Sequence, residues 1–218
     1  MSYRLAIFDM DGTILYTLED LMISVNHALR LEGLPERTLD DIRVFVGNGI
    51  RKTIERAVPG GTPVNVIDRL FNEFNEHYKL HSNDHTRPYD GIVDVIGRIK
   101  ENGVMTACVS NKSDFAVQDL VKIYFDGLFD YSVGAKEGKK LKPAPDSVND
   151  VLQTLKMDRK DAVYIGDSNV DLETAVNSGL PCISVLWGFR DREFLVKHGA
   201  TTFAGVPAEL YDLICKDV

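Results

Sequence analysis

The chain has 218 residues, a length that suits one large domain or two modest ones. Its formal net charge of −8 argues against nucleic acid or an anionic membrane as a partner, because both require a basic surface. No apolar run approaches the roughly 18 residues of a membrane span, and no apolar leader with a cleavage site is evident. We therefore expect a cytoplasmic protein.

Short apolar runs alternate with amphipathic stretches along most of the chain. The runs, each typical of a buried strand, cover residues 5–8, 104–109, 131–133, 162–165 and 182–186. Apolar residues with a helical period lie beside and between them, at 92–99, 115–124, 148–155 and 172–176. Alternating strands and helices predict an α/β fold with a Rossmann-like parallel sheet, covered by helices on both faces.

The interval from residue 16 to residue 85 breaks this alternation. It contains no convincing strand, and its apolar residues recur with a helical period, as at Leu21 and Val25. We predict an all-helical domain over residues 16–85, inserted into a core domain that is formed by residues 1–15 and 86–218.

Polar residues gather where the predicted strands end. The carboxyl ends of parallel strands share one edge of a sheet, so we expect these side chains to lie together. A buried ionised carboxylate without a partner costs several kcal/mol, which indicates that carboxylates there serve a cation or a reaction. Carboxylates suit Mg²⁺, and a lysine with Ser or Thr hydroxyls suits a phosphoryl group. The residues are Asp9, Asp11, Thr13, Ser110, Asn111, Lys112, Lys142, Asp167, Ser168 and Asp171.

Four short motifs at these positions resemble the ordered motifs of the haloacid dehalogenase superfamily. They are Asp9-Met10-Asp11-Gly12-Thr13, Ser110-Asn111, Lys142-Pro143 and Gly166-Asp167-Ser168-Asn169-Val170-Asp171. The helical insertion after the first motif resembles the C1-type cap of that superfamily. One such motif is a weak signal, whereas four in this order with a cap in the expected place are specific. The resemblance implies a haloacid dehalogenase-like core with an all-helical C1 cap.

The resemblance implies three catalytic residues. Asp9 corresponds to the nucleophile that accepts the phosphoryl group as an aspartyl-phosphate. Asp11 corresponds to the general acid that protonates the leaving oxygen and then activates water. Lys142 is expected to neutralise charge on Asp9 and on the phosphoryl oxygens. Dehalogenases of the superfamily lack an acid at the position of Asp11, so its presence points to phosphoryl chemistry.

The resemblance also implies how phosphate and metal are held. Asp167 would bind Mg²⁺ together with the Asp9 carboxylate and the Asp11 backbone carbonyl. Asp171 would act through a bound water or as support for the other ligands. The residues implied to contact the phosphate are Asp9, Met10, Asp11, Thr13, the Ser110 hydroxyl, the Asn111 backbone N–H and Lys142.

The segment Phe45-Val46-Gly47-Asn48-Gly49-Ile50-Arg51 resembles the glycine-rich cap segment of phosphoglycolate phosphatases. Gly47 and Gly49 would let the backbone approach a small substrate. Arg51, Lys52 or Arg56 could pair with a substrate carboxylate, and the alternative that these are ordinary exposed helix charges stays open. The residues we expect to select the substrate are Gly47, Asn48, Gly49 and Arg51.

Taken together, the motifs predict a Mg²⁺-dependent phosphatase that acts on a small phosphorylated metabolite, with 2-phosphoglycolate as the leading substrate. Tyr16-Thr17 departs from the Asp-Ser that usually follows the first motif in phosphoglycolate phosphatases. A pyrophosphatase, a nucleotidase, a sugar-phosphate phosphatase and a phosphotransferase of the same fold therefore remain alternatives. A non-catalytic phosphate-sensing protein is a more distant one. We expect a monomer or a homodimer, with no nucleic-acid or membrane partner.

Overall fold

The computed structural model describes residues 3–216. The chain divides into two compact units, one comprising the chain up to Leu15 and from Pro88 onward, and the other comprising Tyr16–Arg87. None of the helices within the described residues is long and apolar enough to cross a membrane.

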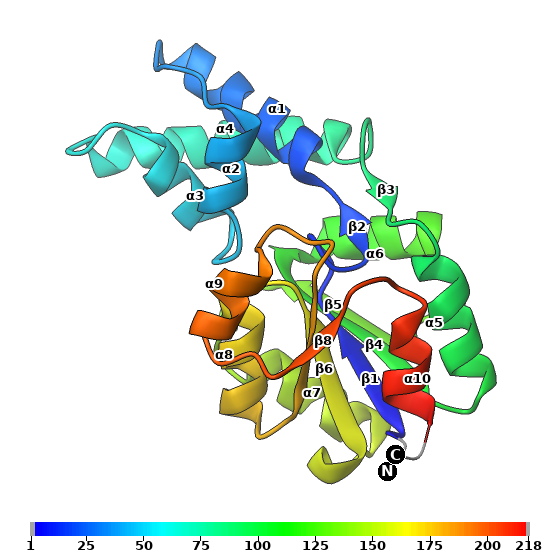
Figure 1. Ribbon diagram of the computed structural model, residues 1–218. Helices are drawn as coiled ribbons and strands as arrows, with labels where there is room; N and C mark the ends of the chain where they lie inside the picture. The colour runs from blue at the N-terminus through cyan, green and yellow to red at the C-terminus, as the bar shows by residue number, and fades with distance from the viewer. Residues whose placement is uncertain (1–2, 217–218) are drawn as a thin grey trace. The chain divides into compact units, whose positions relative to one another are not determined.

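A six-stranded sheet forms the centre of the first unit (Figure 1). Its strands are β1 (Leu5–Phe8), β4 (Met105–Ser113), β5 (Tyr131–Ala135), β6 (Ala162–Gly166), β7 (Cys182–Val185) and β8 (Thr202–Ala204). The order is β5-β4-β1-β6-β7-β8, and each neighbouring pair is parallel. Because β1 lies between β4 and β6, the chain reverses its direction of winding at this point, where α/β proteins bind ligands.

Helices cover both faces of this sheet. They are α5 (Ile92–Glu101), α6 (Asp114–Tyr124), α7 (Asp146–Leu155), α8 (Asn169–Ser178), α9 (Arg192–Lys197) and α10 (Glu209–Cys215), with a 3₁₀ turn at Arg159–Asp161. The alternation of strands and helices confirms the predicted α/β fold class.

The side chains of β1 are buried on both faces, as expected for a central parallel strand. Ala6 and Phe8 pack in one core cluster with apolar residues of α5, α6 and α10. Leu5 and Ile7 pack in the opposite cluster with residues of α7 and α8. Full burial of a large apolar side chain contributes about 1.5–3 kcal/mol, so the two clusters fix β1 firmly in the middle of the sheet.

The second unit is helical. Its helices are α1 (Leu18–Leu31), α2 (Leu39–Phe45), α3 (Ile50–Ala57) and α4 (Val64–His81). One face of α4 is buried through Leu70, Phe74 and Tyr78, which recur every four residues. The chain passes between the units at the two-residue strands β2 (Leu15–Tyr16) and β3 (Arg87–Pro88), which pair with each other.

Candidate active site

Three buried aspartates lie together at the carboxyl end of the sheet. Asp9 follows β1, Asp167 follows β6, and Asp171 belongs to the first turn of α8. Each offers a carboxylate oxygen, and these oxygens all lie within 4.8 Å of one another. The first and fourth sequence motifs therefore meet in space, as neighbouring parallel strands require.

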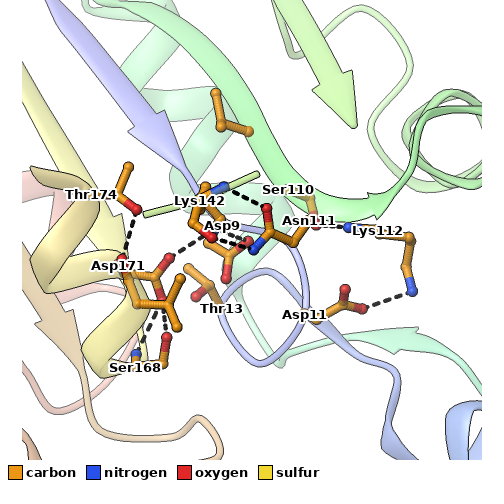
Figure 2. Close-up of polar contacts among 12 residues, drawn as sticks. Asp9, Asp11, Thr13, Ser110, Asn111, Lys112, Lys142, Ser168, Asp171 and Thr174 are labelled. Atoms are coloured by element: carbon orange, nitrogen blue, oxygen red, sulfur yellow. Dashed lines mark hydrogen bonds and ion pairs between the residues drawn. The ribbon is translucent and has the colours of Figure 1, made fainter. Parts of the chain in front are cut away.

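Lys142 lies between two of these carboxylates (Figure 2). Its ammonium nitrogen is 2.7 Å from Asp9 Oδ1 and 2.8 Å from Asp171 Oδ1, and its side chain is 3% exposed. The same nitrogen donates to the Tyr164 hydroxyl at 3.0 Å. A buried ammonium group with two carboxylate partners is fully charged and held in one position.

The Asn111 side chain holds the backbone of Lys142. Its amide nitrogen donates to the Lys142 carbonyl at 2.9 Å, and its amide oxygen accepts from the Lys142 N–H at 2.8 Å. The sequence indicated Asn111 as a phosphate contact through its backbone N–H. In the structure its side chain fixes the backbone of Lys142, which is a contact between the second and third motifs.

The Asp171 side chain accepts hydrogen bonds from the turn that precedes it. Its Oδ2 accepts hydrogen bonds from the Ser168 hydroxyl at 2.7 Å, the Ser168 N–H at 3.1 Å and the Asp167 N–H at 3.2 Å. The negative charge also lies at the N-terminus of α8, which favours it. Asp171 therefore holds both Lys142 and the turn that presents Asp167.

A loop after β7 fixes Asp167 from the other side. The Phe189 N–H donates to Asp167 Oδ2 at 2.6 Å, and the Thr13 hydroxyl donates to Oδ1 at 3.4 Å. A Cβ added to Gly188 would lie 2.3 Å from the Asp167 Cβ, so only glycine allows this approach. Trp187 donates through its indole N–H to the Thr13 carbonyl at 3.0 Å. The motifs did not identify Gly188 and Phe189 as part of the site.

The electrostatics of the cluster indicate a shortage of positive charge. Burial, together with the neighbouring Asp171, raises the pKa of Asp9 well above its ordinary value, although Lys142 opposes the shift. Burial and Asp171 also raise the pKa of Asp167 to about 7. Burial by itself would lower the pKa of Lys142, but Asp171 and Asp9 outweigh it and raise the value well above normal. The carboxylates thus repel one another unless a further cation joins them.

The donor set fits Mg²⁺. Within the described residues, the cluster of potential metal ligands consists of carboxylates alone, and hard cations prefer oxygen ligands. Because the pKa values of Asp9 and Asp167 are raised by burial and like charge, a divalent cation would relieve the repulsion that raises them. Asp9 and Asp167 are the residues that could hold the ion directly. Lys142 pairs with one oxygen of Asp9, whereas both oxygens of Asp171 are engaged, Oδ1 by Lys142 and Oδ2 by the turn.

The other predicted residues of this unit lie around the cluster. Asp11 Oδ1 is 2.9 Å from the Lys112 ammonium, and Figure 2 shows Asp11 directed toward Lys112. The Ser110 hydroxyl is buried and accepts from the Lys112 N–H at 3.1 Å. The Met10 side chain is fully buried in the core, so only its backbone can meet a ligand.

The four residues predicted to select the substrate belong to the helical unit. Gly47 and Gly49 adopt positive φ values of 124° and 83°, which favour glycine. Asn48 accepts a hydrogen bond from Arg56 at 2.8 Å, and Arg51 donates to Asp68 at 2.7 Å. The glycine-rich segment is therefore a defined turn before α3, and its basic side chains pair within the unit.

Comparison with known proteins places the chain in a family. The model of the haloacid dehalogenase-like hydrolases matches residues 6–185. The chain belongs to this family. It is 33% identical to a phosphoglycolate phosphatase of Mesorhizobium japonicum over 88% of the chain and 86% of that protein. It is also 33% identical to a phosphoglycolate phosphatase of Agrobacterium fabrum, over 86% of the chain and 82% of that protein.

A solved structure resembles the whole chain. It is the crystal structure of a protein from Lactobacillus delbrueckii subsp. bulgaricus that is predicted to be a phosphoglycolate phosphatase. The two chains superpose with a TM-score of 0.94 at 36% sequence identity, and the match covers 100% of each. The resemblance first suggested by the four motifs is therefore confirmed.

Proposed function

We propose that this protein is a Mg²⁺-dependent phosphatase that hydrolyses a small phosphate monoester through an aspartyl-phosphate on Asp9. The observation that carries the proposal is the position of Lys142, 2.7 Å from Asp9 and 2.8 Å from Asp171, beside Asp167. An anionic nucleophile and an anionic phosphate repel each other; Lys142 supplies part of the positive charge that such a reaction requires, and Mg²⁺ held at Asp9 and Asp167 would supply the rest. The relatives named as phosphoglycolate phosphatases support the same reaction class.

Asp9 is the nucleophile of the first step. One of its carboxylate oxygens forms a bond to phosphorus while the bond from phosphorus to the leaving oxygen breaks. Asp11 gives a proton to that oxygen, so the product leaves as an alcohol. Lys142 and the Ser110 hydroxyl hold the phosphoryl oxygens, with the backbone N–H groups of the Met10 loop beside them.

Water completes the reaction. Asp11, now ionised, accepts a proton from a water molecule, whose oxygen attacks phosphorus as the bond to Asp9 breaks. Asp9 and Asp167, with the Asp11 backbone carbonyl, would hold Mg²⁺, which supplies charge neutralisation to the phosphoryl group when bound. Asp171 supports this set by holding Lys142 and the turn of Asp167.

The leading substrate is 2-phosphoglycolate. The names of the relatives support this choice, and the positive φ values at Gly47 and Gly49 support a glycine-rich turn like that of a cap. We assign leaving-group selection to Gly47, Asn48, Gly49 and Arg51, with Arg51 as the partner of the substrate carboxylate. Pyrophosphate, nucleotides and sugar phosphates are the competing substrates.

A variant assay tests the assignment of Asp9 as the nucleophile, and a panel of phosphate esters tests the choice of substrate. Asp9→Asn is expected to abolish Mg²⁺-dependent hydrolysis of 4-nitrophenyl phosphate while the circular dichroism spectrum is unchanged. Asp94→Asn, at an exposed position on α5, is the matched control and is expected to remain active. Retained turnover by Asp9→Asn would contradict the assignment of Asp9 as the nucleophile. In a panel of esters, 2-phosphoglycolate is expected to give the highest kcat/KM, and a higher value for pyrophosphate or a nucleotide would reassign the substrate.

A further inference from the structure

A second buried lysine lies beside the site, and the reaction described above does not use it. The Lys112 side chain is 3% exposed, and its ammonium nitrogen is 2.9 Å from Asp11 Oδ1. Burying an ammonium group costs several kcal/mol unless a carboxylate compensates it. The ion pair with Asp11 supplies that compensation, so each side chain constrains the other.

Asp11 stands apart from the other acidic residues of the site. The carboxylate cluster contains Asp9, Asp167 and Asp171 but not Asp11. Figure 2 shows the Asp11 side chain directed toward Lys112 rather than toward Asp9. When Asp11 is ionised, four carboxylates and the ammonium groups of Lys112 and Lys142 leave two formal negative charges, which one divalent cation balances. The ion pair between Lys112 and Asp11 therefore lets the site hold a fourth acidic side chain without adding to its net negative charge.

The backbone at Lys112 is fixed independently of this ion pair. Its N–H donates to the Ser110 hydroxyl oxygen, and the pairing of β4 with β5 is irregular between Val109 and Ser113. A Cβ added to Gly134 of β5 would lie 2.5 Å from the Lys112 carbonyl oxygen, so this close approach requires glycine. The irregular end of β4 thus presents Lys112 from a rigid position.

Neighbouring residues at the end of β4 serve two different partners. The Asn111 side chain bonds to the backbone of Lys142, and the Lys112 side chain bonds to Asp11. Successive side chains of a strand point in opposite directions, which accounts for this division. The second motif therefore reaches both the lysine of the third motif and the second aspartate of the first.

We propose that Lys112 is a positioning residue for Asp11, and this inference rests on the proposed function. The Lys112 ammonium holds Oδ1 of Asp11 and keeps the carboxylate out of the metal-binding cluster. In the acid form of Asp11 the proton is carried by Oδ2, because Oδ1 accepts from the Lys112 ammonium. That proton passes to the leaving oxygen as the bond between that oxygen and phosphorus breaks, and Asp11 is left as a carboxylate paired with Lys112. Lys112 acts through Asp11 and touches neither the substrate nor the metal ion.

Leaving-group dependence separates this role from a general structural one. A good leaving group departs without a proton, whereas a poor one requires the general acid. The value of kcat/KM reports the steps up to departure of the leaving group, so it excludes the later activation of water. Lys112→Met is expected to lower kcat/KM for phenyl phosphate by about 100-fold, and to change it little for 2,4-dinitrophenyl phosphate. An equal loss for both esters, or no loss for either, overturns the proposal.

A matched control uses a lysine–aspartate pair at the opposite end of β4. The Lys100 ammonium nitrogen is 2.6 Å from Asp130 Oδ1, and the Lys100 side chain is 32% exposed. Asp130 also accepts a hydrogen bond from the Thr106 N–H. Lys100→Met is expected to leave the ratio of the two kcat/KM values unchanged. If circular dichroism shows that Lys112→Met is unfolded, Lys112→Gln takes its place in the same measurement.

A double-mutant cycle tests whether Lys112 acts through Asp11. In an Asp11→Asn background, Lys112→Met is expected to leave the ratio of phenyl to dinitrophenyl kcat/KM unchanged. A further fall in that ratio means that Lys112 acts by another route and overturns the proposal. Wild-type protein that hydrolyses neither ester contradicts the proposed function itself, so the two failures are distinguishable.

Discussion

Among the described residues, the ion pairs with a buried lysine lie in the α/β unit, and those of the helical unit have exposed cations. In the α/β unit, the buried Lys142 pairs with Asp9 and Asp171, and the buried Lys112 pairs with Asp11. In the helical unit, the ion pairs of Arg51, Lys52 and Arg69 lie at the surface. Exposed pairs of this kind contribute little to stability, because solvent screens them and the side chains lose freedom when they pair.

The buried ion pairs mark the part of the chain that performs chemistry. A buried ammonium group between carboxylates stabilises the fold less than apolar residues of similar volume would, so its presence indicates a function rather than stability. Surface pairs need no such explanation. The comparison therefore separates residues whose loss should change the reaction from residues whose loss should change almost nothing.

Removal of a buried lysine and of an exposed lysine should have the most different effects. Lys142→Met leaves Asp9 and Asp171 without their cation, so we expect phosphatase activity to fall about 100- to 1,000-fold. Breaking a buried pair also costs about 3–5 kcal/mol of unfolding free energy, measured by urea denaturation without Mg²⁺. Lys52→Met removes an exposed partner of Glu55 and is expected to shift the melting temperature by less than about 2 °C. Equal destabilisation by the two substitutions would contradict the comparison.

A change of pH sharpens the same contrast within the α/β unit. Burial raises the pKa of Asp167 to about 7, so below pH 7 this carboxylate takes up a proton that competes with Mg²⁺. Without metal, an acid whose pKa is raised on folding stabilises the protein below its ordinary pKa near 4, and this contribution is lost as the pH rises to about 7. The increase in melting temperature on adding Mg²⁺ should therefore be small at pH 5.5 and large at pH 8.

Asp167→Asn is the control for this titration. The substitution removes one metal ligand and, with it, the proton that competes with the metal. The increase in melting temperature caused by Mg²⁺ is therefore expected to be small at every pH. Wild-type protein that gains the same increase at pH 5.5 and pH 8 would show that Asp167 does not bind the ion.

Much of the fold could be predicted from local patterns. The run Leu5–Phe8 is apolar on both faces, which is typical of a central parallel strand, and the structure has β1 there. The edge strand β8 was not predicted, because three residues that begin with the exposed Thr202 carry no periodic signal. Within the predicted all-helical interval, no periodic signal marks α3 as a separate element, since Ile50–Ala57 has few apolar residues. Tertiary contacts decide such short elements.

The candidate site could be predicted only in part. The position of Asp9 and Asp167 after strands indicated that the two would meet, because strand ends in a parallel sheet share an edge. The two hydrogen bonds between the Asn111 side chain and the Lys142 backbone join segments 31 residues apart, and no motif encodes them. Gly188 could have been noticed as a glycine just after an apolar run, but its approach to Asp167 is a matter of three-dimensional packing. The catalytic roles themselves stay predictions.

The smallest expected effect concerns the helical unit and its one assigned contribution to function. Arg51 is 45% exposed on its side chain and pairs with Asp68 at 2.7 Å, so Arg51→Gln should leave the melting temperature almost unchanged. If Arg51 pairs with the substrate carboxylate, KM for 2-phosphoglycolate should rise about 2- to 5-fold, the range expected for an exposed ion pair. KM for 4-nitrophenyl phosphate, which has no carboxylate, should not change.

Arg69 provides the matched control for Arg51, because it is a surface arginine of the same unit that is paired with Glu32 at 2.7 Å. Arg69→Gln is expected to leave KM unchanged for both esters. A rise in KM for 4-nitrophenyl phosphate with Arg51→Gln would mean that the substitution disturbs the site in general rather than recognition of the carboxylate. No change for either ester would place Arg51 with the ordinary surface pairs, and the exposed charges of the helical unit would then have no part in choosing the substrate.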